Sequence, residues 1–125
     1  MKMLAEKKAP PDEVATMTPL DEGVAGSVTE LIKEFEGDIQ YDAHSFTARV
    51  ERSAARRKLQ RLGHIVLGPI ALHLRAHPPE TNSDLAVAWG YLLNRIEEVV
   101  DPKKSGPRML NNIPGWITWA ERFAA

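Results

Sequence analysis

Apolar residues at helical spacing limit most strongly what this chain can fold into. Between residues 85 and 100 they recur every three or four positions and occupy one arc of a helix, with Asn94, Glu97 and Glu98 on the opposite side. No segment alternates apolar and polar residues between turn signals, as a half-buried β-strand would. We therefore predict an all-α fold. The apolar arc of this segment consists of Leu85, Ala88, Trp89, Leu92, Leu93, Ile96, Val99 and Val100.

Two helices are predicted in the first half of the chain. The first begins after Thr18, whose hydroxyl can cap it, and ends near Gly37, because glycine is common just past a helix end. The second spans residues 41–62, but its apolar residues shift from one face to another. Such a shift indicates either a helix that packs against two neighbours or a bend near Ser53. Gly63 then ends this helix.

The second half of the chain adds a buried helix and a short terminal one. Residues 65–74 are apolar around nearly the whole helical circumference, and Pro69 falls early, where a proline in the first turn is tolerated. A short helix follows the Pro–Gly pair at 114–115. With the segment at 84–100, this gives four main helices and a short fifth, arranged as antiparallel hairpins. The last helix places on one side Trp116, Trp119 and Phe123.

Length and composition predict a single domain. The chain has 125 residues, which is enough for one hydrophobic core. Residues 1–16 combine charges with two adjacent prolines and little periodicity, so we expect a flexible tail before an all-α domain at residues 17–125. The absence of cysteine excludes thiolate zinc sites, iron–sulfur clusters and thiol nucleophiles. No export or membrane-spanning segment is visible, and we expect a cytoplasmic protein.

Charge is unevenly distributed along a chain whose formal net charge is −1. Residues 12–42 carry nine acidic side chains and one lysine, a net of −8, whereas residues 43–77 carry seven basic side chains and one glutamate, a net of +6. Two explanations remain open. The basic helix can pack against the acidic first helix and neutralise it within the chain, which we favour, or it can form a binding surface.

The basic segment supplies the first candidate site. Arg49, Arg52 and Arg56 lie on one helical stripe, which Gln60 extends, and a second stripe holds Arg57 and Arg61. Guanidinium groups in such rows can bind an acidic protein surface or the phosphates of a nucleic acid. No aromatic residues are interleaved among these arginines for base stacking, so nucleic acid is the less favoured partner.

His73 and His77 are the candidate metal ligands, because histidines four residues apart share one face of a helix. No third strong ligand follows at a recognisable spacing, so we expect neither a metal nor another cofactor. The sequence also lacks a nucleophile elbow, a phosphate-binding loop and a paired-carboxylate motif. No catalytic residue is therefore predicted, and a small metal-dependent or hydrolytic enzyme ranks third among the functions.

The aromatic residues of the terminal helix are the last candidates. Trp116 and Trp119 can dock into the core of their own chain or anchor a protein partner. A helix this short is not stable by itself in water. We therefore expect it to dock within the chain, most simply across the helix at residues 85–100. That arrangement favours a monomer over a homodimer.

Small and apolar residues recur at helical spacing in two consecutive segments, which contain Ala54, Ala55, Leu59, Leu62 and Gly63 in the first and Pro69, Ile70, Leu72 and Leu74 in the second. With this pattern, residues 49–77 resemble a HEAT repeat, which pairs two antiparallel helices. This resemblance implies a short HEAT-like array, a scaffold that binds a protein partner without identifying it. Because no self-similar period recurs along the chain, a compact orthogonal bundle is the alternative architecture. We therefore predict a non-enzymatic helical protein-interaction module, such as a small adaptor or regulatory subunit. A nucleic-acid-binding helical domain is the alternative.

Overall fold

All regular secondary structure in the described residues is helical, which confirms the all-α prediction. The computed structural model describes residues 22–41 and 43–124. The predicted tail at 1–16 and the predicted cap at Thr18 lie outside these residues. The helices of the described part are α1 (Glu22–Tyr41), α2 (Phe46–Arg52), α3 (Ala54–Leu62), α4 (His64–Ala76), α5 (Asp84–Val100) and α6 (Ile113–Phe123).

Polar side chains cap the starts of four helices, because the first amide groups of a helix have no partner within it. Each cap accepts a hydrogen bond from the amide three residues later, at 3.1 to 3.4 Å. These short sequence signals fix where each helix begins. The caps are Ser45 for α2, Ser53 for α3, Ser83 for α5 and Asn112 for α6.

The predicted second helix is broken at Ser53 into α2 and α3. Ser53 has an extended backbone, with ψ at 113°, and its amide donates to the Val50 carbonyl at 3.4 Å. Its hydroxyl donates to Asp38 of α1 at 2.6 Å. Of the two explanations offered for the shift of apolar faces, the bend near Ser53 is therefore the one confirmed, and the described residues form six helices instead of five. Gly63, at φ 60°, separates α3 from α4 as predicted.

Three local predictions about α1 and α4 are wrong. Gly37 does not end α1, which continues to Tyr41 because Ile39 is buried in the core at 1% exposure. Pro69 lies past the first turn of α4, where its ring removes the amide that would bond the Ile65 carbonyl. Leu72 is 71% exposed, so α4 is not buried around its whole circumference.

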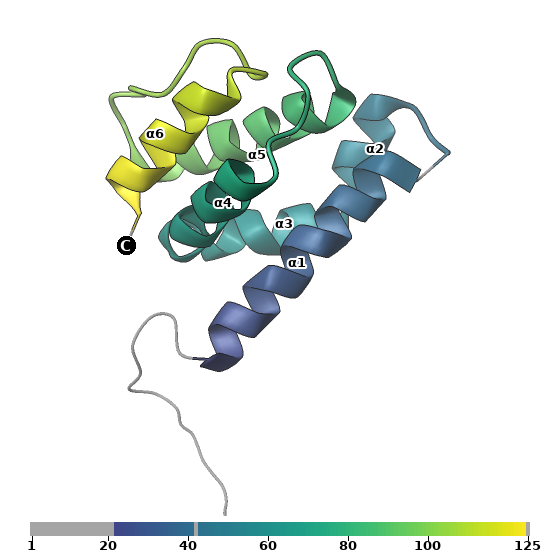
Figure 1. Ribbon diagram of the computed structural model, residues 1–125, viewed down its shortest axis with the longest axis horizontal. Helices are drawn as coiled ribbons and strands as arrows, with labels where there is room; N and C mark the ends of the chain where they lie inside the picture. Colours follow the sequence, from purple (N-terminus) through teal and green to yellow (C-terminus); the bar gives the residue numbers. More distant parts are fainter. Residues whose placement is uncertain (1–21, 42, 125) are drawn as a thin grey trace, which may run out of the picture.

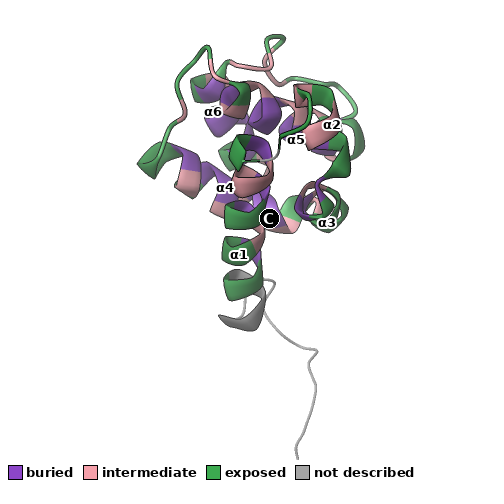
Figure 2. Ribbon diagram, turned by 90° about the vertical axis from the view of Figure 1, so that its right-hand side faces the viewer, coloured by how far each residue is buried: buried purple, intermediate pink, exposed green. Residues whose placement is uncertain are grey.

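The core forms where α4, α5 and α6 meet α1 and α3. Within the bundle, α4 lies between α6 and α1 (Figure 1). The helices turn their buried faces inward and their exposed faces outward (Figure 2). The terminal helix α6 packs against α5, as predicted, and also against α4. The largest fully buried side chains include Trp89, Trp116, Trp119, Phe35, Leu67 and Leu92.

Helix α5 departs from its predicted faces at two positions. Glu97, predicted on the polar side, is 3% exposed, whereas Val99, predicted in the apolar arc, is 80% exposed. The loop at 101–112 explains the burial of Glu97, because it folds back over α5. A Cβ at Gly90 would lie 1.7 Å from the carbonyl oxygen of Leu110, so a glycine is needed for this close approach.

Candidate anion-binding pocket

The break at Ser53 divides the four candidate arginines of the predicted second helix into two groups. We call these four residues the basic row: Arg49, Arg52, Arg56 and Arg57. Arg49 and Arg52 line a groove of about 610 Å³ between α1 and the α2–α3 junction, together with Glu34 and Asp38. Acidic and basic side chains therefore line the same groove here. The other two arginines of the row lie beyond the break and face a different pocket.

Arg49 is used within the fold. Its guanidinium donates to the carbonyl of Ile39, near the end of α1, and to Asp84 at 2.7 Å, in the first turn of α5. The carboxylate partner of Arg49 thus comes from α5, although the sequence suggested pairing with the acidic α1. Because this side chain of α2 bonds to both α1 and α5, we assign Arg49 a structural role.

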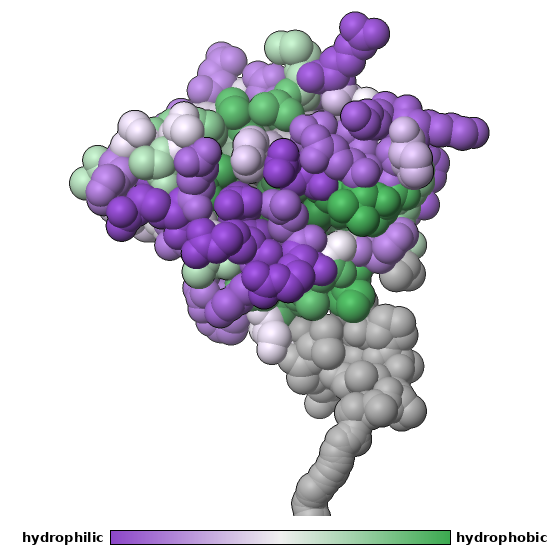
Figure 3. Space-filling view, turned by 180° about the vertical axis from the view of Figure 1, so that it is seen from behind, coloured by the Kyte–Doolittle hydropathy of each residue, from purple (hydrophilic) through white to green (hydrophobic). Residues whose placement is uncertain are grey.

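Arg56 and Arg57 line a second pocket, on the side of the molecule where α3 and α5 lie. This pocket has a volume of about 460 Å³ and also contains Arg61, from the last turn of α3, and Arg95, from α5. Figure 3 shows strongly hydrophilic side chains gathered on this side. We call the pocket formed by these four residues the arginine pocket. Its remaining lining residues are Gln60 and Val99.

The helix break orients two of these arginines. Because α2 ends at Arg52, its last carbonyl groups lack helical partners, and side chains from α3 turn back onto them. Arg56 Nε donates to the Val50 carbonyl at 2.8 Å, and Arg57 Nη1 donates to the Glu51 carbonyl at 2.8 Å. The same local signal that starts α3 thus fixes the direction of both side chains.

The four guanidinium groups differ in what they contact. Arg56 also donates from Nη1 to Gln60 at 2.7 Å, and its guanidinium lies 5.8 Å from the centre of the Tyr91 ring. Arg95 forms an exposed ion pair with Glu98 at 3.5 Å. Within the described residues, Arg61 has neither a hydrogen-bond nor an ion-pair partner.

The cations of the arginine pocket are close enough to affect one another. Burial lowers the pKa of Arg56, and the neighbouring charges of Arg57 and Arg95 lower it further, against the opposite effect of Tyr91 and Glu51. Arginine stays protonated at physiological pH despite such a shift. An anion that entered the pocket would relieve this repulsion, so the site is suited to bind negative charge.

The candidate metal ligands lie together but have other partners. The rings of His73 and His77 are 5.4 Å apart. His73 Nε2 lies 2.9 Å from Glu36 Oε2, and Trp89 Nε1 donates to the same oxygen at 2.9 Å. In the described part of the chain, no three histidine or acidic side chains are placed to hold a metal ion. This cluster links α4 and α5 to α1.

Both candidate tryptophans are buried within their own chain. Trp116 is 0% exposed and Trp119 1% exposed, and their rings meet edge to face at 5.4 Å. Trp119 Nε1 donates to Asp101 at 3.0 Å. The C-terminal helix therefore docks within the chain as expected.

Two buried carboxylates, which the sequence did not reveal, accept hydrogen bonds from the 101–112 loop. Glu97 accepts a hydrogen bond from the amide of Gly106 at 2.7 Å. Asp101 accepts from the hydroxyl of Ser105 at 2.6 Å and from its amide at 2.8 Å. Hydrogen bonds from Ser105 and Trp119 lower the pKa of Asp101 to about 2, although burial opposes this shift. No local signal marks these residues, since the loop that covers them follows later in the chain.

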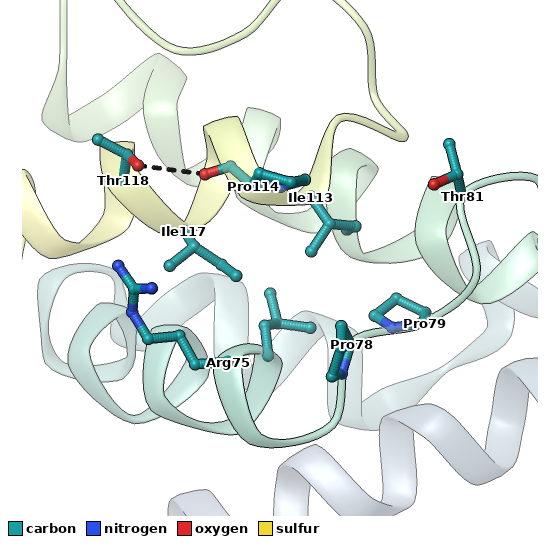
Figure 4. Close-up of a pocket in the computed structure, with 9 residues that line it drawn as sticks. Arg75, Pro78, Pro79, Thr81, Ile113, Pro114, Ile117 and Thr118 are labelled. Carbon is teal, nitrogen blue, oxygen red and sulfur yellow. Dashed lines mark hydrogen bonds between the residues drawn. The ribbon is translucent and has the colours of Figure 1, made fainter.

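A third, more apolar groove separates α4 from α6 (Figure 4). Its volume is about 430 Å³, and Arg75, which lines it, forms a two-bonded ion pair with Glu121 at 2.5 and 2.7 Å. The hydroxyl of Thr118 is engaged with the Pro114 carbonyl at 3.2 Å. Prolines and aliphatic side chains make up most of the remaining lining, which offers few groups for chemistry. These residues are Leu74, Pro78, Pro79, Ile113 and Ile117.

No protein-family model, curated protein or solved structure matches this chain. The resemblance to a HEAT repeat therefore stays a prediction. Among the described helices, none combines the length and the apolar character that a membrane span requires.

Proposed function

We propose that this protein is a helical protein-interaction module, a small adaptor or regulatory subunit, that binds an acidic segment of a partner protein at the arginine pocket. One observation carries the proposal. Four guanidinium groups from two helices line one open pocket, and of these four only Arg95 forms an ion pair with a carboxylate of the described residues. A cytoplasmic location is part of this proposal and is supported by the absence of cysteine from the sequence.

The distribution of the arginines supports a protein partner over a nucleic acid. Duplex DNA presents phosphates along its whole length, so its partners usually carry an extended basic surface. Here the basic row is interrupted at Ser53, and Arg49 is already bonded to Ile39 and Asp84. The formal net charge of −1 adds no long-range attraction to a polyanion. A local pocket fits a short acidic segment better.

A peptide titration tests this proposal. The probe is a fluorescein-labelled octaglutamate peptide, and its anisotropy is followed as the full-length protein is added at low and physiological salt. Exposed charge contacts are worth about 0.2–1 kcal/mol each. The double variant Arg57→Ala/Arg61→Ala should therefore weaken binding by roughly tenfold, since about 1.4 kcal/mol corresponds to that factor.

Arg108→Ala is the matched control, because Arg108 is an exposed arginine in the 101–112 loop, outside the pocket. It should leave the affinity for octaglutamate unchanged. Equal losses in the control and in the double variant would show attraction to charge in general and would contradict the proposal. Tighter binding to duplex DNA than to the peptide, with a steep salt dependence, would favour the nucleic-acid alternative.

A further inference from the structure

The arginine pocket offers more hydrogen-bond donors than one carboxylate can accept. Arg56 uses Nε and Nη1 within the fold, and Arg57 uses Nη1. Their other guanidinium nitrogens, and the whole guanidinium of Arg61, have no partner among the residues that the structure describes. A single arginine can bond both oxygens of a carboxylate in parallel, and a carboxylate offers only about four acceptor sites in all. The pocket is therefore built for an anion with more charge and more oxygens.

We infer that the arginine pocket binds a phosphate monoester, carried on a phosphorylated side chain of the partner protein. This inference rests on the proposed function, because it takes the partner to be a protein, and it specifies the group that the pocket selects. A phosphate monoester has a charge of about −1.5 to −2 at neutral pH and three acceptor oxygens, so it can bond several guanidinium groups at once.

The fixed position of Arg56 favours this ligand. Its side chain is held by the Val50 carbonyl and by Gln60, and its guanidinium lies over the Tyr91 ring. A side chain that is already ordered loses little entropy when a ligand binds. The lowered pKa of Arg56 reflects burial and then the neighbouring charges of Arg57 and Arg95, and a dianion would offset that repulsion more fully than a single carboxylate.

Glu98 makes the pocket selective between the two kinds of anion. Its carboxylate already pairs with Arg95 at 3.5 Å, and both side chains are about half exposed, at 45% and 44%. An incoming anion must compete with this carboxylate for Arg95. A carboxylate of the partner has the same charge as the Glu98 carboxylate, so it would bind Arg95 no more strongly than Glu98 does. A phosphate dianion has a larger charge and therefore displaces Glu98 from Arg95 more readily.

Val99 defines a neighbouring requirement. It lines the same pocket and is 80% exposed, although a valine of α5 would usually face the core. A partner that places an apolar residue beside the phosphorylated one would cover this side chain and remove it from water. The preferred segment therefore combines a phosphorylated residue with an adjacent apolar residue.

Three versions of one peptide test the inference. The probe is a nine-residue peptide of alternating glycine and alanine with a central Val–X pair, where X is phosphoserine, glutamate or serine. Calorimetry with the full-length protein should show at least tenfold tighter binding for phosphoserine than for glutamate, and no saturable binding for serine. Arg61→Ala and Arg95→Ala should each weaken phosphopeptide binding about fivefold. Arg108→Ala should not change it.

Equal affinity for the phosphoserine and glutamate peptides would overturn the phosphate inference and leave the proposed function standing. Failure of the phosphopeptide and of octaglutamate would contradict both. If inorganic phosphate alone bound as tightly as the phosphopeptide, the pocket would be a site for a free ion, which would also overturn the inference. Tighter binding of duplex DNA, whose phosphates are diesters, would do the same. Thermal unfolding of each variant verifies that the fold is intact.

Discussion

Asp101, just after α5, links that helix to α6 through hydrogen bonds. One of its oxygens, Oδ2, accepts hydrogen bonds from the hydroxyl and amide of Ser105 and from Trp119 Nε1. Arg122 of α6 donates to the Ser105 hydroxyl at 2.9 Å and extends the network. The charged form of Asp101 is the one that these donors stabilise, so its protonation should loosen the loop and the terminal helix together.

Asp101 predicts how stability depends on pH. Its pKa falls from the ordinary value of 3.8 to about 2 in the folded chain. A carboxyl group with a lowered pKa contributes stability above its unfolded pKa and loses it as the pH falls through the folded value. The advantage of the wild-type protein over Asp101→Asn should therefore be constant above about pH 5 and fall progressively as the pH drops from about 5 through the folded pKa of about 2. Urea unfolding of both proteins across this range measures it, and an advantage that does not fall between about pH 5 and pH 2 would contradict the assignment.

Trp119 predicts a large effect on stability. Trp119→Ala removes a ring that is 1% exposed and leaves Asp101 with one donor fewer, so the free energy of unfolding should fall by about 3–5 kcal/mol. Trp119→Phe keeps most of the ring and loses the hydrogen bond, at a cost of about 1–3 kcal/mol. Thr118→Ala, on the exposed side of α6, is the control and should change stability by less than about 0.5 kcal/mol. Wild-type stability in Trp119→Ala would mean that the helix is not docked within the chain.

At the scale of single elements, Ser53 joins three helices. It ends α2, caps α3 through its side chain, and donates its hydroxyl to Asp38 of α1. Because the cap sets the start of α3, it also sets the direction in which Arg56 and Arg57 turn back toward α2. A change at Ser53 should therefore affect both stability and the arginine pocket.

Two serine caps allow a matched comparison at this scale. Ser53→Ala removes a buried cap and the bond to Asp38, and should lower the free energy of unfolding by about 1–2 kcal/mol. Ser45→Ala removes an exposed cap whose bond to Ala48 is 3.4 Å long, and should cost no more than about 0.5 kcal/mol. Chemical denaturation of the two variants provides both values. A larger loss of unfolding free energy in Ser45→Ala than in Ser53→Ala would contradict the claim that Ser53 connects α1, α2 and α3.

The helices were more predictable from sequence than their boundaries. Apolar spacing located the helices of the described residues, and the shift of apolar faces indicated the bend at Ser53. Gly37 misled because a local stop signal is weaker than the burial of Ile39 beyond it. Glu97 was assigned to the wrong face because the 101–112 loop, which helical spacing cannot reveal, covers it, and nothing in the structure explains the exposure of Val99.

At the scale of the whole molecule, the candidate site is assembled from segments far apart in the sequence. The sequence identified Arg56 and Arg57 as candidate binding residues because they belong to the basic row. That row also contained Arg49, whose guanidinium bonds within the fold. The sequence could not identify Arg95 as a binding residue, because nothing in its local sequence shows that α5 lies beside α3. Tertiary packing thus gave Arg49 of the first predicted stripe a structural role and joined Arg56, Arg57 and Arg61 to Arg95 of α5 in one pocket.

The most direct test of the account is to map where an acidic peptide binds on the isotope-labelled full-length protein. Titration of octaglutamate, followed through backbone amide chemical shifts, should move the signals of Arg57, Arg61 and Arg95 most and saturate with a single affinity. Signals of the α4–α6 groove, such as those of Ile113 and Ile117, should stay in place. Shifts concentrated in that groove, or spread evenly over the exposed lysines and arginines, would contradict the claim that the arginine pocket is the binding site.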